Sequence, residues 1–153
     1  MAFLLRHVFR QGRVIRSIIR VTLKTRRGAS DGGTLPNLPG PELCETLPPP
    51  PPGLVKDYIL YCGGDPRWYS DVIPPHMFPQ WGFPILARTL ECLRCDMRRM
   101  LNAGFSLRVN APLPAGRPLR LKARLESADE NDRRVIITQS LVTETDGAPQ
   151  ALQ

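Results

Sequence analysis

The stretch PLPAGRPLRLKARL, from Pro112 to Leu125, contains a turn and a strand that together decide the expected fold. Its first half, Pro112 to Pro118, is built from proline and glycine, residue types that favour tight turns. From Leu119 to Leu125, apolar residues alternate with Arg and Lys, the period of a strand with one buried and one solvated face. We therefore expect a turn that leads directly into an antiparallel strand.

Two further strands flank this stretch in the sequence. Val135 to Thr145 is rich in β-branched residues and predicts a strand, and the charged residues from Asp129 to Arg134 predict a hairpin connection before it. Ser106 to Asn110 alternates as a shorter strand. The order of these segments indicates an antiparallel meander.

Helical patterns precede the strands. Val55 to Cys62 predicts a short helix, which Gly63 and Gly64 end. Apolar residues from Ile85 to Leu101 recur close to helical spacing and predict one long helix, with Pro84 in its first turn. A long helix followed by an antiparallel meander predicts an α+β fold in which the sheet wraps the helix.

The chain divides into three parts by composition. Residues 26–53 hold five consecutive prolines, Pro48 to Pro52, among other prolines and glycines, and predict an extended linker. This proline run is either a spacer or a ligand for an SH3-like groove. The linker would separate a basic amphipathic helix in residues 1–25 from a folded domain in residues 54–153.

The first 27 residues carry the net charge of the protein. The chain has 21 Lys and Arg against 14 Asp and Glu, and eight of the basic residues precede Gly28 without any acid. Six of them, from Arg6 to Lys24, are spaced by three or four residues, which places them on one side of a helix, opposite Leu4, Val8 and Ile15. Such a helix lies in a membrane interface or packs on a protein surface. The candidate membrane-contact residues are Arg6, Arg10, Arg13, Arg16 and Arg20.

Several classes of protein do not fit this composition. No apolar stretch is long enough for a transmembrane helix, and arginines interrupt the N-terminal apolar residues that a secretory signal would need. The stripe of arginines has no interleaved aromatic residues, so no nucleic-acid partner is expected. Cys92 and Cys95 lie inside the predicted helix without a second ligand pair, so we expect reduced thiols and no metal site. These features favour a cytoplasmic protein, peripheral to a membrane if the first helix binds lipid.

The order of these motifs resembles the MaoC-like hot-dog family of acyl-thioester hydratases and dehydratases. The resemblance covers about Val55 to Leu152 and is strongest from Pro112 to Leu125. The Gly64-Asp65 turn and the loop from Pro74 to Pro84 also resemble family segments. The family fold is a hot dog, in which a long central helix is wrapped by a curved antiparallel sheet.

The resemblance implies binding of an acyl thioester of coenzyme A or of an acyl carrier protein. Family enzymes hydrate 2-enoyl thioesters, or dehydrate 3-hydroxyacyl thioesters, with an Asp and a His and without a cofactor. Asp65 matches the family's Asp, whereas Ser70 stands where the family has its His, which leaves His76 as the candidate catalytic partner. Each residue also has a structural interpretation, Asp65 as a turn cap and His76 as a loop residue. Candidate substrate-binding residues are Tyr69, Trp81 and Gly82.

The family sheet continues with at least one more strand after the segment that corresponds to Val135–Thr145. Here only a short segment follows Thr145, so we expect a hot-dog domain that lacks its last strand and exposes a sheet edge. The resemblance implies a homodimer, whose partner could cover that edge. The alternative to an acyl-thioester-binding protein is a non-catalytic dimerising module held at a membrane surface by its basic helix.

We predict that anionic lipid vesicles retain the full chain and lose it when residues 1–25 are removed. The arginines would bind lipid phosphates while the apolar face enters the acyl boundary, and added salt would weaken retention. Co-sedimentation with vesicles measures both. The membrane interpretation would be contradicted if the vesicles retained the shortened chain as well as the full chain, or if they retained neither.

Overall fold

The computed structural model describes residues 37–93, 100–131 and 134–153. The predicted basic amphipathic helix, with its candidate membrane-contact residues, lies outside the described residues, as do the first part of the predicted linker and Cys95. The described part has an α+β fold, as expected from the sequence, with two α-helices and a long antiparallel sheet.

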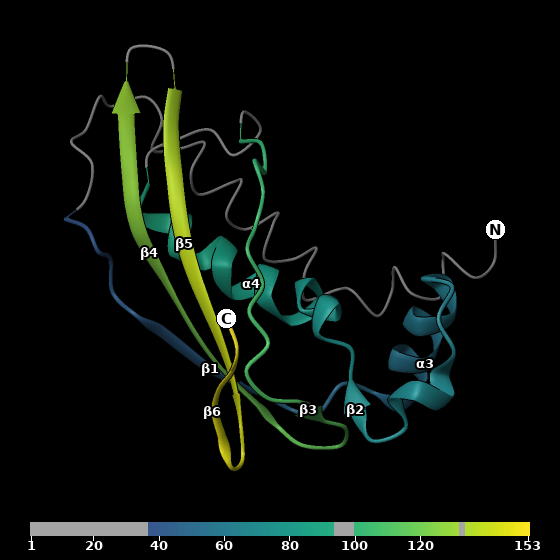
Figure 1. Cartoon of the computed structure of the whole chain (residues 1–153). Coiled ribbons are helices and arrows are strands. Elements are labelled where there is room, and N and C mark those ends of the chain that lie inside the picture. The colour runs from purple at the N-terminus through teal and green to yellow at the C-terminus, as the bar shows by residue number, and fades with distance from the viewer. Residues whose placement is uncertain (1–36, 94–99, 132–133) are drawn as a thin grey trace.

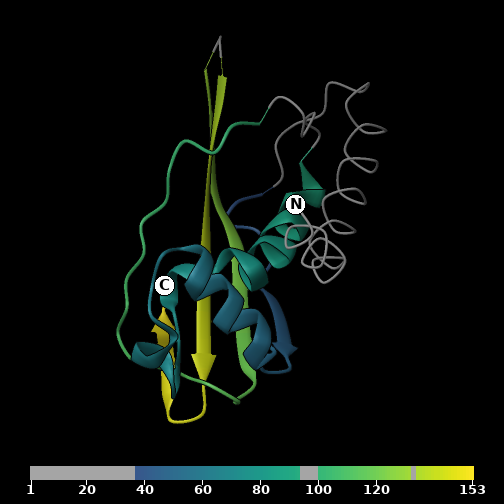
Figure 2. The same cartoon turned by 90° about the vertical axis from the view of Figure 1, so that its right-hand side faces the viewer.

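Figures 1 and 2 show how the helices and strands are arranged. The helices are α3 (Pro52–Tyr61) and α4 (Pro79–Thr89), with 3-10 turns η1 (Pro66–Tyr69), η2 (Pro75–Met77) and η3 (Leu90–Cys92). The strands are β1 (Leu43–Leu47), β2 (Val72–Ile73), β3 (Leu113–Pro114), β4 (Leu119–Asn131), β5 (Arg134–Thr145) and β6 (Ala148–Leu152). The main sheet has the order β1-β4-β5-β6, and β2 pairs with β3 in a separate two-stranded sheet.

The two strands expected from the sequence form the centre of the main sheet. β4 begins at Leu119 as predicted, and β5 pairs with it in antiparallel register, with Ala123 opposite Leu141. The register shifts between Leu125 and Ser127, where the ladder has a bulge. Both strands continue past the bulge as a two-stranded arm that extends beyond α4 (Figure 1).

Part of the predicted linker is a strand. Leu43 to Leu47 form β1, which pairs with β4 so that Leu43 lies opposite Ala123. The assignment of these residues to a linker is therefore wrong. The surrounding prolines concealed a short alternating segment, and their position outside the strand is compatible with a strand at the edge of a sheet.

The central helix differs from its predicted bounds. α4 begins six residues earlier than expected, at Pro79, and Pro84 lies inside it and not in its first turn. After η3 the backbone is extended at Leu93, with φ −84° and ψ 136°, so a continuous helix from Ile85 to Leu101 is wrong. The bond from the Gly82 N–H to the Phe78 carbonyl, 2.7 Å long, belongs to the first turn that the sequence pattern missed.

The C-terminal residues contribute a strand. β6 follows β5 and pairs with it, with Leu152 opposite Thr143, so the expectation that no strand follows Thr145 is wrong. Ser106–Asn110 is not a regular strand and makes only an isolated bridge from Val109 to Leu152. Its backbone still runs beside β6, since Arg108 and Gln153 exchange hydrogen bonds of 2.6 and 2.9 Å.

The hydrophobic core lies between α4 and one face of the main sheet. This inner face carries the apolar residues of the alternating pattern in β4, which are each 1% exposed. Gly82 lets α4 approach β5 closely, because a Cβ atom at this position would lie 2.5 Å from Leu141 Cδ2 and 3.3 Å from Phe78 Cδ2. The core residues include Ile59, Ile73, Met77, Trp81, Ile85, Leu113, Leu119, Leu121, Ala123 and Leu152.

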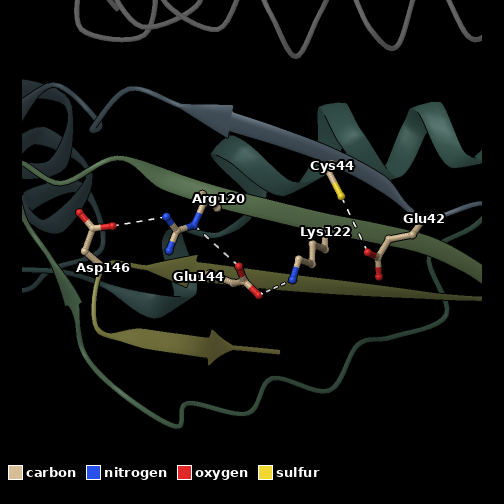
Figure 3. A network of polar contacts seen from close by, with 6 residues as sticks. All are labelled: Glu42, Cys44, Arg120, Lys122, Glu144 and Asp146. Carbon is tan, nitrogen blue, oxygen red and sulfur yellow. Dashed lines mark hydrogen bonds and ion pairs between the residues drawn. The ribbon is translucent and has the colours of Figure 1, made fainter.

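The opposite face of the sheet is polar. Glu144 accepts a 2.7 Å bond from Lys122 and lies 3.8 Å from Arg120, which also pairs with Asp146 (Figure 3). The Glu144 interaction is the main reason that the pKa of Lys122 lies above its usual value. Because these charged side chains favour contact with solvent, the outer face of the sheet stays exposed, and the hydrophobic core lies on the inner face.

We predict that Gly82→Leu lowers the free energy of unfolding by about 1–3 kcal/mol, because a side chain there must displace Leu141 from the core. Urea denaturation measures the change. Phe83→Leu is the matched control: Phe83 is the next residue along α4 and is 41% exposed, so we expect a smaller loss. Equal stability of Gly82→Leu and the unmodified protein would contradict the close approach of α4.

Candidate functional site

Asp65 acts as the N-cap of η1. Its Oδ1 accepts a 2.9 Å bond from the Arg67 backbone N–H, and both carboxylate oxygens accept bonds from the Arg67 guanidinium at 2.6 to 3.1 Å. The bonds from Arg67 hold the pKa of Asp65 below its usual value. A carboxylate stabilised as an anion in this way is a weak proton acceptor, so the geometry corresponds to the structural interpretation of Asp65.

His76 lies in η2 with an exposed side chain. Its ring stacks at a tilt on Tyr58 of α3, with 5.5 Å between the ring centroids. Its backbone carbonyl accepts a 3.0 Å bond from the Tyr58 hydroxyl. These contacts fix the loop against α3 and give the imidazole no carboxylate partner of the kind that orients a catalytic histidine.

The two candidate catalytic residues have different partners in the structure. Among the described residues, no hydrogen bond or ion pair joins Asp65 to His76, and each is engaged by a different neighbour. General acid–base hydration needs both groups within reach of one substrate. The catalytic pairing of Asp65 and His76 therefore stays a prediction from the sequence.

Tyr58 has the largest pKa shift among the groups of this region. Burial, together with the neighbouring Cys62 thiol, raises the pKa of Tyr58 to about 12. Tyr58 lies on α3 and Cys62 caps its C-terminal end four residues later, a spacing that by itself indicates no particular chemistry. The phenol remains protonated at neutral pH and serves as the donor that holds the His76 loop.

The three candidate substrate-binding residues are parts of the packing. Trp81 is 4% exposed and donates a 3.1 Å bond from Nε1 to the Thr143 hydroxyl. Tyr69 is half-buried against the core, and Gly82 is the point where α4 contacts β5. None of the three lines the cavity found elsewhere in the structure.

A cavity of about 250 Å³ lies at the C-terminal end of α4. Its apolar walls come from the segment before β1, from β1 itself and from β4, and its polar walls from the end of α4 and from η3. No local sequence pattern predicts this cavity, because three segments that lie far apart in the chain form it. The lining residues are Pro41, Leu43, Arg88, Thr89, Glu91, Cys92 and Leu125.

Polar contacts fix the helical wall of the cavity. Arg88 of α4 pairs with Glu45 of β1 at 2.9 Å, and its side chain is 44% exposed. Thr89 donates a 2.8 Å bond to the Leu86 carbonyl, and Gln139 of β5 donates to the same carbonyl at 2.8 Å. The end of α4 is thus bound to both β1 and β5, which gives the cavity a defined shape.

Metal ligands and disulfides are two further features that could define a site. No three His, Cys, Asp or Glu side chains among the described residues are placed to hold a metal ion. Cys44, Cys62 and Cys92 are free thiols. Within residues 37–93, 100–131 and 134–153, the helices are all too short or too polar to cross a lipid bilayer.

We predict that Trp81→Phe lowers the free energy of unfolding by about 1–3 kcal/mol, because it leaves the buried Thr143 hydroxyl without its donor. Thermal or urea unfolding measures the loss. Adding Thr143→Val should recover part of it, since the unpaired hydroxyl is then removed. An unchanged stability of Trp81→Phe would contradict a packing role for Trp81.

No family model, curated protein or solved structure matches the chain. The function is therefore inferred from the cavity and the side chains around it.

Proposed function

We propose that this chain is a MaoC-like hot-dog protein that binds an acyl thioester and places the acyl group in the cavity at the C-terminal end of α4. The cavity carries this proposal, because its apolar walls and polar rim suit a ligand with an apolar end and a charged remainder. The packing of α4 on an antiparallel sheet is compatible with a hot-dog domain.

The size of the cavity favours a short acyl group. A volume of about 250 Å³ corresponds to roughly eight groups the size of a water molecule, at about 30 Å³ each. Pro41, Leu43 and Leu125 supply the apolar walls. Each methylene buried there would contribute about 0.8 kcal/mol, so affinity should rise with chain length until the cavity is full.

Arg88 supplies the charge for the rest of the ligand. Its guanidinium is partly exposed beside the cavity and is positioned by Glu45. A planar guanidinium binds phosphate oxygens well, and both coenzyme A and the carrier-protein prosthetic group contain phosphate. The ion pair with Glu45 orients Arg88 and leaves part of its surface open to a ligand.

Binding without turnover fits the candidate catalytic residues. Hydration of a 2-enoyl thioester, or dehydration of a 3-hydroxyacyl thioester, would require Asp65 and His76 to act on one substrate. Asp65 is instead held by Arg67, and the His76 ring lies on Tyr58. The second candidate is a non-catalytic dimerising module held at a membrane surface. The Asp65–Arg67 ion pair favours it, because a carboxylate held in this way is a poor base. A module of this kind is expected not to bind acyl thioesters.

We predict that acyl-CoA raises the thermal stability of the protein, with the shift growing from two to about eight carbons and then levelling off. Thermal unfolding with acyl-CoAs of increasing chain length measures this dependence. No shift with any acyl-CoA or acyl carrier protein would contradict acyl-thioester binding and favour the second candidate.

Matched variants locate the ligand. Leu43→Trp should fill the cavity and shorten the longest accepted acyl chain. Thr46→Trp places the same ring at an exposed position of β1 and should not change the accepted length.

Arg88→Gln should weaken acyl-CoA binding about tenfold, which corresponds to the loss of one charged hydrogen bond, whereas Arg67→Gln should not weaken it. Asp65→Asn and His76→Ala should leave binding unchanged, and the unmodified protein should not consume 2-enoyl-CoA.

A further inference from the structure

A run of prolines joins β1 to α3. β1 ends at Leu47 and α3 begins at Pro52, so Pro48–Pro51 form the whole connection between them (Figure 1). Because β1 belongs to the main sheet, the run lies between two elements of the folded domain and does not separate that domain from the residues before it. Pro52 has a structural reason, since proline suits the first turn of a helix. A strand and a helix can be joined by many other short sequences, so the four prolines before Pro52 need another explanation.

The run has the conformation of a polyproline II helix. The ring of each proline fixes φ, and a proline that follows excludes the α-helical region for the residue before it. Pro51 has φ −57° and ψ 131°, close to the polyproline II values of about −75° and about 145°. None of the peptide bonds from Pro48 to Pro52 is cis. The connection is therefore a short left-handed helix with about three residues per turn.

One side of this helix faces solvent. Pro48 and Pro51 are exposed, whereas Pro49 and Pro50 between them are half-buried. Residues three apart project from the same side of a polyproline II helix, because one turn holds about three residues. The exposed side therefore presents two proline rings in the spacing Pro-x-x-Pro, which the aromatic-lined grooves of SH3 domains bind.

Both ends of the run are fixed by the fold. At one end, Leu47 pairs with Leu119 of β4 and packs against the hydrophobic core. At the other end, the Pro51 carbonyl accepts bonds of 2.9 and 3.2 Å from the N–H groups of Leu54 and Val55. A ligand that is already held in its bound conformation loses little conformational entropy when a partner binds. The two anchored ends therefore prepare the run for binding.

The backbone of the run offers hydrogen-bond acceptors. Among the described residues, no hydrogen bond reaches the carbonyl groups of Pro48, Pro49 or Pro50. Proline has no N–H group, so the run combines apolar rings with open acceptors. Tryptophan and tyrosine side chains supply the matching chemistry, because each has a large apolar ring and a polar N–H or O–H donor. A groove lined by these side chains is therefore the kind of surface that fits the run.

We propose that Pro48–Pro51 is a docking ligand for a protein domain with an SH3-like groove, whose aromatic pockets receive Pro48 and Pro51. Of the two interpretations of the proline run, spacer and ligand, the ligand accounts for the exposed Pro-x-x-Pro side, the anchored ends and the open carbonyls. The proposal does not depend on acyl-thioester binding, because no residue of the run lines the cavity.

Titration of the full chain into a panel of purified, isotope-labelled SH3 domains tests the proposal. We expect the nuclear magnetic resonance signals of the aromatic groove to shift and saturate in at least one domain of the panel. Replacing the groove tryptophan of that domain by alanine should abolish the shifts. If no domain of the panel binds the chain, or if the shifts lie outside the groove, the proposal is overturned.

Proline variants of the chain locate the docking side. Pro48→Ala and Pro51→Ala should each weaken binding about tenfold, because each removes most of a proline ring from a pocket of the groove. Pro51 is also the N-cap of α3, so Pro48→Ala is the variant that tests a ring without touching the helix. Pro118→Ala is the matched control: Pro118 is exposed as well but lies in the turn before β4, and we expect no change in binding. Binding that neither Pro48→Ala nor Pro51→Ala weakens would refute the docking site.

Discussion

The close contact between α4 and β5 is the constraint on which the rest of the structure depends. Gly82 allows the helix to approach Leu141, and the buried bond from Trp81 to Thr143 fixes its position along the strand. At the other end of α4, Gln139 binds the Leu86 carbonyl. Because the half-buried Gln139 amide and the buried Trp81 indole both need partners, these bonds determine where the helix lies on the sheet and therefore where the cavity opens.

The sequence predicts the elements whose side-chain pattern is regular. Leu119–Leu125 alternates without interruption, and it forms the first half of β4 with its apolar residues buried. The pattern is weaker where proline intervenes. β1 was concealed by its flanking prolines, and Pro84 suggested a helix start although α4 begins at Pro79. In both places tertiary packing, which a single sequence does not display, overrides the local preference of proline.

The candidate site illustrates a different difficulty. A Gly-Asp turn has the same sequence whether its carboxylate activates water or caps a 3-10 turn, and only the position of Arg67 distinguishes the two. The cavity could not be predicted because no local sequence motif corresponds to it. Its walls combine Pro41, Leu125 and Arg88, which lie far apart in the sequence and meet only because β1 joins the sheet beside the end of α4.

The two faces of the main sheet differ in their chemistry. Its outer face is occupied by paired charges around Glu144, which favour solvent over a covering layer. Its inner face is filled by α4 except at the helix end, where the cavity lies next to β1. The proposed acyl-thioester site therefore lies beside β1, at the end of α4, and not on the charged outer face of the sheet.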